Sequence, residues 1–131
     1  MGRYEVLRIT IPLPPVTKKN SQRIVIVRGR PMILPSQKYK DYEQACALYV
    51  RPLKEPISFG VNVKCIYYMP TRRRVDLTNL LEATHDMLVK HGVLADDNSN
   101  IVWSVDGSRV LYDKGRPRTE IEITPIMEDG K

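Results

Sequence analysis

The chain of 131 residues has few aromatic rings, few cysteines and no long apolar run. Its two cysteines, Cys46 and Cys65, form no CxxC pair and no zinc-binding spacing, so we expect reduced core thiols and no disulfide framework. No apolar stretch approaches the ~18 residues that span a bilayer, and the segment 1–8 has no apolar signal core. We therefore expect a cytoplasmic protein without a membrane partner. The sequence also has no Gly-rich phosphate loop, nucleophile elbow or dinucleotide fingerprint.

Acidic residues are missing from one long stretch, because eight basic side chains and no carboxylate lie between Arg8 and Lys40. Residues 1–75 hold 15 basic and 4 acidic residues, a net charge of +11, whereas residues 76–131 hold 6 basic and 11 acidic residues, a net charge of −5. Such a split is typical of a surface that attracts polyanions beside one that concentrates carboxylates. Solvated surface charge that serves only solubility is the plainer alternative.

The hydrophobic pattern predicts one α+β domain over residues 1–131. Strands are predicted over 4–11, 23–27, 31–34, 57–69, 101–111 and 119–126, and helices over 37–50 and 76–91. Arg28-Gly29-Arg30 is predicted to turn a hairpin, Ser36 to cap the first helix and Gly92 to end the second. The order βββαβαββ implies a small mixed β-sheet with two helices packed on it.

The second predicted helix carries acidic residues on one side. At about 100° per residue its leucines form an apolar face, and Asp76, Asn79, Glu82 and Asp86 line the opposite side. The solvated face of an amphipathic helix gives the same pattern. Asp76 in the first turn also suits the helix dipole.

A second acidic pair, Asp96-Asp97, follows in a short turn before the next predicted strand. A helix packed back on its neighbouring strands would bring that pair near Asp76. Clustered carboxylates hold Mg²⁺, which activates water and stabilises charge on a phosphodiester. The arrangement of an acidic pocket beside basic surface therefore favours a nuclease.

Other candidates are weaker. His85 and His91 lie six residues apart, not the four that place two imidazoles on one helix face, and we expect core or surface roles for both. Trp103 alternates with Ile101 and Val105 and is expected in the core.

Four separated blocks of the sequence carry a resemblance to a known family. They are Pro14-Pro15 with Lys19-Asn20, the run RRRVDLTNLL over 72–81, Asp86-Met87-Leu88, and GVLADD over 92–97. In this order and spacing they resemble the RusA-type Holliday-junction resolvases, endonucleases of phage origin found in bacteria.

The resemblance implies an α+β homodimer that cuts four-way DNA junctions with Mg²⁺ or Mn²⁺ in DNA recombination and repair. Asp76 and Asp97 match the catalytic metal ligands, Asp86 and Asp96 match other acidic positions, and Asn79 matches the motif asparagine. The expected DNA-binding residues, which would position phosphates rather than read bases, are Lys18, Lys19, Asn20, Arg72, Arg73 and Arg74.

Three positions depart from the family pattern. Thr78 stands where the second motif aspartate is usual, Glu82 where a functionally important lysine is common, and Val75 where an arginine precedes the motif. Either the site is rearranged, with Glu82 or Asp86 supplying the missing carboxylate, or cleavage is weakened or lost. The alternative function is that of a non-catalytic DNA-binding relative with a degenerate metal site.

Overall fold

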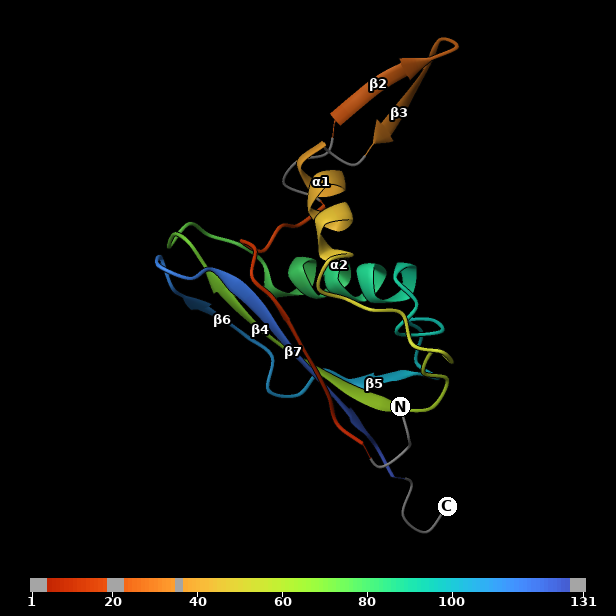
Figure 1. Ribbon diagram of the computed structural model, residues 1–131. Coiled ribbons are helices and arrows are strands. Elements are labelled where there is room, and N and C mark those ends of the chain that lie inside the picture. The colour runs from red at the N-terminus through yellow and green to blue at the C-terminus, as the bar shows by residue number, and fades with distance from the viewer. Residues whose placement is uncertain (1–4, 19–22, 35–36, 128–131) are drawn as a thin grey trace.

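The computed structural model describes residues 5–18, 23–34 and 37–127. Its elements are β1 (Leu7–Ile11), β2 (Arg23–Val27), β3 (Arg30–Leu34), α1 (Gln37–Cys46), β4 (Val61–Met69), α2 (Leu77–Lys90), β5 (Val102–Ser104), β6 (Arg109–Tyr112) and β7 (Arg118–Pro125). The predicted α+β class, with a mixed sheet and two helices, is confirmed (Figure 1). The predicted cap Ser36 lies outside the described residues.

Strand β4 is the centre of the main sheet. On one side it pairs antiparallel with β7, which pairs antiparallel with β1; on its other side it pairs in parallel with β5 and β6. Val61, Val63, Cys65 and Tyr67 are buried along β4, while the residues between them are partly exposed. The predicted alternation is thus confirmed, because one face of the sheet packs on the core and the other faces solvent.

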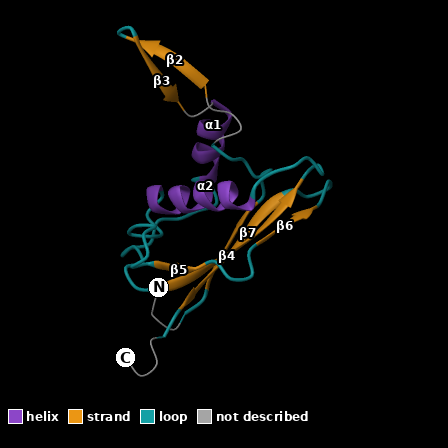
Figure 2. Cartoon of the chain, turned by 180° about the vertical axis from the view of Figure 1, so that it is seen from behind, coloured by secondary structure: helices purple, strands orange, loops and turns teal. Residues whose placement is uncertain are grey.

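Helix α2 crosses the covered face of the sheet (Figure 2). Leu80, Met87 and Leu88 are buried in the same core cluster as the inward residues of β4 and β7. The Tyr67 hydroxyl lies 2.7 Å from the Thr84 hydroxyl, and this buried hydrogen bond ties β4 to α2. The helix ends as predicted, with Gly92 at a φ of 78°.

Helix α1 is shorter than predicted and ends at Cys46 instead of residue 50. The backbone tightens after it, because Leu48 N–H donates to Ala45 O at 3.1 Å and Tyr49 N–H donates to Cys46 O at 2.9 Å. This turn directs Leu48 outward and Val50 into the core.

The single strand predicted over 101–111 is wrong, because it divides into β5 and β6 around a turn at Asp106-Gly107. Gly107 has a φ of 87°, which ends the extended conformation. Asn62 on β4 holds the turn, since its side-chain oxygen accepts the Asp106 N–H at 2.7 Å and its amide donates to Asp106 O at 3.1 Å.

Strand β4 begins at Val61, four residues later than predicted. Ile57 forms an isolated bridge with Leu94 instead. Gly60 lies directly against the Trp103 ring, where a Cβ atom would come within 2.2 Å of Trp103 Cε2. Trp103 is 39% exposed, so its predicted place in the core is wrong.

Strands β2 and β3 form the predicted hairpin and pair with each other in a separate two-stranded sheet. Arg28 and Gly29 turn the chain with φ values of 52° and 76°. The hairpin extends beyond α1, away from the main sheet (Figures 1 and 2).

Within the described ranges, no helix is both long enough and apolar enough to cross a membrane. Cys46 and Cys65 are buried and free, as predicted. Burial raises the pKa of the Cys46 thiol to about 11 and that of Cys65 to about 12.

Candidate functional site

The first predicted site residue, Asp76, is the N-cap of α2, but its side chain does not cap the helix. An N-cap aspartate usually accepts a backbone N–H of the first turn. Here Asp76 Oδ2 instead accepts the Asn79 side-chain amide at 3.2 Å, and both residues belong to the predicted motif. The Asp76 carboxylate is exposed, so it remains accessible to a ligand.

A second acidic centre lies further along α2, where Asp97, His85 and Asp86 interact electrostatically. Desolvation and then the negative charge of Asp86 raise the pKa of Asp97. Burial lowers the pKa of His85, while the charges of Asp97 and Asp86 act in the opposite direction. Asp96 Oδ1 accepts the Asp97 backbone N–H at 2.7 Å and fixes the acidic turn. His85 and Asp86 belong to α2, and Asp96 and Asp97 belong to the loop between α2 and β5.

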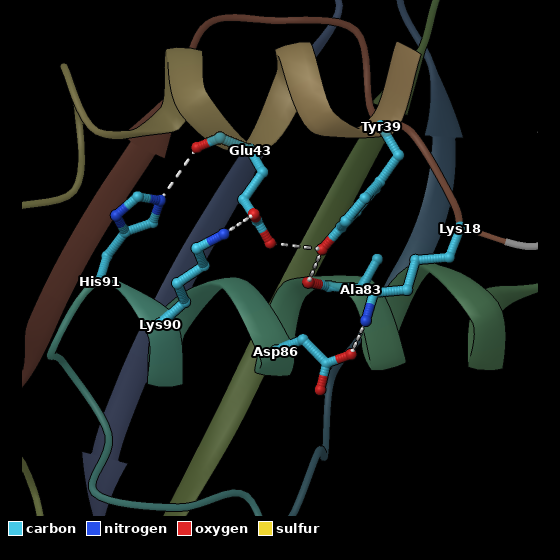
Figure 3. Close-up of polar contacts among 7 residues, drawn as sticks. All are labelled: Lys18, Tyr39, Glu43, Ala83, Asp86, Lys90 and His91. Carbon is cyan, nitrogen blue, oxygen red and sulfur yellow. Dashed lines mark hydrogen bonds and ion pairs between the residues drawn. The ribbon is translucent and has the colours of Figure 1, made fainter. Parts of the chain in front are cut away.

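Lys18 forms an ion pair with Asp86 and lies over the Tyr39 ring, with its Nζ atom 5.4 Å from the ring centroid. Figure 3 shows Lys18 reaching Asp86 from the segment that follows β1. The sequence predicted Lys18 as a phosphate contact and did not indicate this pairing. The predicted contacts Lys19 and Asn20 lie outside the described residues.

Polar contacts between α1 and α2 fix this arrangement (Figure 3). Glu43 on α1 forms an ion pair with Lys90 and accepts a hydrogen bond from Tyr39 at 3.2 Å. His91 Nε2 donates to the Glu43 backbone oxygen at 2.9 Å. His91 therefore has a structural role at the helix–helix contact.

The two acidic centres are separated along α2. Asp76 and Asp86 are ten residues apart, or about 15 Å along a helix that rises 1.5 Å per residue. They cannot both reach one ion from the same helix. Glu82 and Thr78 lie between them and are exposed. Among the residues that the structure describes, no group of three or more His, Cys, Asp or Glu side chains could hold a metal ion.

The predicted basic run divides into two parts. The Arg72 guanidinium stacks on the Tyr112 ring, 4.3 Å from its centroid. Arg73 and Arg74 line a cavity beside the start of α2 instead, together with Lys38 from α1. Lys38 belongs to the basic half of the sequence, but no sequence pattern distinguishes it from the other basic residues there.

An α+β fold with exposed carboxylates beside a basic surface is compatible with the class of small nucleases, which act on nucleic-acid phosphodiesters. The sequence matches the family model of endodeoxyribonuclease RusA over residues 12–124. It is 33% identical over 119 residues to the crossover junction endodeoxyribonuclease rusA of Enterobacteria phage 82, covering 90% of this chain and 93% of that protein. The chain therefore belongs to the RusA family of endodeoxyribonucleases, as the sequence motifs predicted.

Proposed function

We propose that this protein is a metal-dependent endodeoxyribonuclease that resolves four-way DNA junctions in recombination and repair, acting in the cytoplasm. The observation that carries the proposal is the motif aspartate Asp76, which is exposed at the start of α2 beside a cavity lined by Arg73 and Arg74. A carboxylate at that position can serve a metal ion while the guanidinium groups hold the phosphate. Membership of the RusA family supports the same activity.

The donor set is compatible with Mg²⁺ or Mn²⁺. Mg²⁺ needs only one or two carboxylates, together with waters and substrate phosphate. Asp76 and Asp97 are the proposed catalytic ligands, one at each of the two acidic centres, and Asp86, Asp96 and Glu82 are the carboxylates available to assist. Desolvation and then the negative charge of Asp86 raise the pKa of Asp97, and a bound cation would offset that charge repulsion. When bound, the metal supplies an activated water and charge stabilisation at the phosphodiester.

The protein's own side chains bind and orient the DNA. Arg73 and Arg74 contact phosphates; Lys18, which pairs with Asp86, and Arg72, which lies over the Tyr112 ring, are further cations for the DNA backbone. We extend the same role to Lys19 and Asn20 from the sequence. Contacts of this kind give affinity and orientation rather than base recognition.

The proposed assembly is a homodimer, because a four-way junction cut symmetrically fits a two-fold protein. The β2–β3 hairpin offers an interface. Ile24, Ile26 and Ile33 are 71%, 77% and 66% exposed, and an apolar two-stranded hairpin is marginally stable alone. A second copy of the chain is the occupant we propose, since isoleucine side chains cannot bind phosphates.

A non-catalytic junction-binding protein is the second candidate function. It is favoured by Thr78 and Glu82, which leave the motif with one aspartate fewer and without its usual lysine. Such a protein would keep the basic surface and bind junctions without cleaving them.

A labelled four-way junction incubated with Mg²⁺ or Mn²⁺ separates the two functions. We expect paired cuts near the branch point and no cutting of a linear duplex of the same sequence. Asp76→Asn should abolish cleavage and leave binding intact or tighter, because it removes a charge that repels phosphate. Binding without cleavage by the parent protein in both metals would favour the second candidate.

A further inference from the structure

The cavity beside the start of α2 has features that phosphate binding alone does not require. Its volume is about 590 Å³, within the range of ~300–1,000 Å³ that is usual for small-molecule sites. The segment after β1, the first turn of α1, the end of β4 and the loop before α2 all contribute to it. The lining residues are Pro14, Pro15, Val16, Thr17, Lys38, Met69, Pro70, Thr71, Arg73, Arg74 and Val75.

One part of the lining is cationic. Lys38, Arg73 and Arg74 contribute positive charge, and no acidic side chain is among the described lining residues. The Thr71 hydroxyl accepts the Arg73 backbone N–H at 3.4 Å and helps to fix the loop that carries both arginines. Three cations around one concave site select a group with concentrated negative charge, such as a phosphate.

Most of the other lining residues are apolar, apart from Thr17 and Thr71. Pro14, Pro15, Met69 and Pro70 line the same space. Apolar side chains do not stabilise a bound phosphate, whereas an unstacked nucleobase can pack against them. The cavity therefore combines what a phosphate needs with what a base needs.

A paired base in a duplex cannot enter the cavity, because it is stacked and hydrogen-bonded inside the helix. A nucleotide at a branch point can leave its stack at lower cost. We propose that the cavity receives one unpaired nucleotide from the branch point of the DNA, with its phosphate at Lys38, Arg73 and Arg74 and its base against the proline and methionine wall. This inference rests on the proposed function and adds to it a means of recognising branched structure.

The position of the cavity supports this role. Val75 lines the cavity and directly precedes Asp76, the exposed motif carboxylate. A nucleotide held there would place the adjoining backbone next to the start of α2. Recognition of the branch and placement of a backbone phosphate would then be coupled through two neighbouring residues.

The test is a four-way junction with 2-aminopurine at each branch-point position in turn, titrated with protein in metal-free buffer. For at least one position we expect a several-fold rise in fluorescence, because the base leaves its stack. Lys38→Gln should weaken junction binding about tenfold and lower the log–log salt slope by about 0.9, the value for one phosphate contact. Lys40→Gln, two residues along α1 and outside the cavity lining, is the matched control and should behave as the parent.

A change in the apolar wall separates base binding from phosphate binding. Pro14→Ala should reduce the fluorescence rise and leave the salt slope unchanged, because Pro14 carries no charge. Addition of the free dinucleotide pTpT should compete at the cavity more effectively than inorganic phosphate at equal concentration. If 2-aminopurine fluorescence rises at no branch-point position, or if inorganic phosphate competes as well as pTpT, the proposed nucleotide site is contradicted.

Measurements on the same samples distinguish failure of the nucleotide site from failure of the proposed nuclease activity. Fluorescence that depends on Lys38 without cleavage in Mg²⁺ or Mn²⁺ would support the cavity and contradict the nuclease. If the protein cleaves the junction but raises 2-aminopurine fluorescence at no position, the result would support the nuclease activity and contradict nucleotide binding in the cavity.

Discussion

Asp97 carries a negative charge that the folded chain disfavours. Its raised pKa means that ionisation is harder in the native state than in the unfolded chain, with desolvation and the charge of Asp86 as the causes. Ionised Asp97 therefore lowers stability at neutral pH, and this penalty disappears as the pH falls through the raised value toward the ordinary 3.8. Functional sites often carry a cost of this kind.

We expect Asp97→Asn to raise the melting temperature slightly at pH 7 in metal-free buffer and to have no such effect below about pH 4. Mg²⁺ should then stabilise the parent more than the variant, because the variant has lost a proposed metal ligand. Thermal unfolding with and without Mg²⁺ measures both effects. Asp106→Asn, a change at another exposed aspartate, is the control. A lower melting temperature for Asp97→Asn at pH 7 would contradict the assigned repulsion.

Thr78 and Glu82 decide whether the site is rearranged or degenerate. They lie four residues apart on the exposed side of α2, so the longer Glu82 side chain can reach toward the position of Thr78. Thr78→Asp should lower the Mg²⁺ concentration for half-maximal junction cleavage several-fold, because it adds a hard, charged oxygen ligand. Glu82→Ala should raise that concentration or abolish cleavage.

Measuring the rate of junction cleavage as a function of Mg²⁺ concentration tests both variants. A silent Glu82→Ala, together with Thr78→Asp that creates activity absent from the parent, would identify a degenerate site. If both changes are silent in an active enzyme, the metal does not bind at this part of α2.

At the scale of elements, the sequence predicted those features that depend on residues close together in the chain. The apolar face of α2, the Gly92 terminator and the β2–β3 turn are of this kind. The division of residues 101–111 into β5 and β6 was missed although Asp106-Gly107 is a turn signal, because the flanking residues continue the alternation.

The candidate site shows the same limit. The sequence indicated the acidic residues of α2 and the Asp96-Asp97 turn from their motif. It could not indicate that Lys18 pairs with Asp86, 68 residues away, or that Arg72 stacks on Tyr112. Such pairs depend on how α1 and the strands pack, which periodicity does not specify. The cavity draws on four segments for the same reason.

Asn62 links two elements by side-chain hydrogen bonds, and its removal tests the β5–β6 turn. Asn62→Ala leaves the Asp106 backbone without its side-chain partners, at a cost of about 1–2 kcal/mol. The melting temperature should fall by roughly 3–6 °C for a chain of this size. Ser58→Ala, at an exposed position outside the turn, should have little effect. Equal melting temperatures for the parent and Asn62→Ala would show that the turn forms without this support.

At the scale of the whole molecule, charge and apolar surface are segregated. Helix α2 and the Asp96-Asp97 turn carry the acidic centres, and the cavity gathers cations beside the start of α2. The hairpin projects away from the main sheet (Figure 1), and its isoleucines are exposed. Ile24 lies opposite Ile33 in the hairpin ladder, and Ile26 lies two residues along the same strand, so all three share one face. A face of this composition is suited to a protein interface rather than to solvent.

The proposed dimer interface at the hairpin is tested by Ile24→Thr combined with Ile26→Thr, which keeps β-branched side chains and removes apolar surface. Because full burial of an isoleucine contributes about 1.5–3 kcal/mol, the double change should weaken the dimer by at least ~100-fold. Sedimentation velocity over a concentration series measures the shift toward monomer. Leu48→Thr removes an equally exposed apolar side chain, 79% exposed, outside the hairpin and should leave the dimer intact. A parent protein that is monomeric throughout would contradict the dimer itself, whereas an unchanged dimer in the double variant would place the interface elsewhere on the chain.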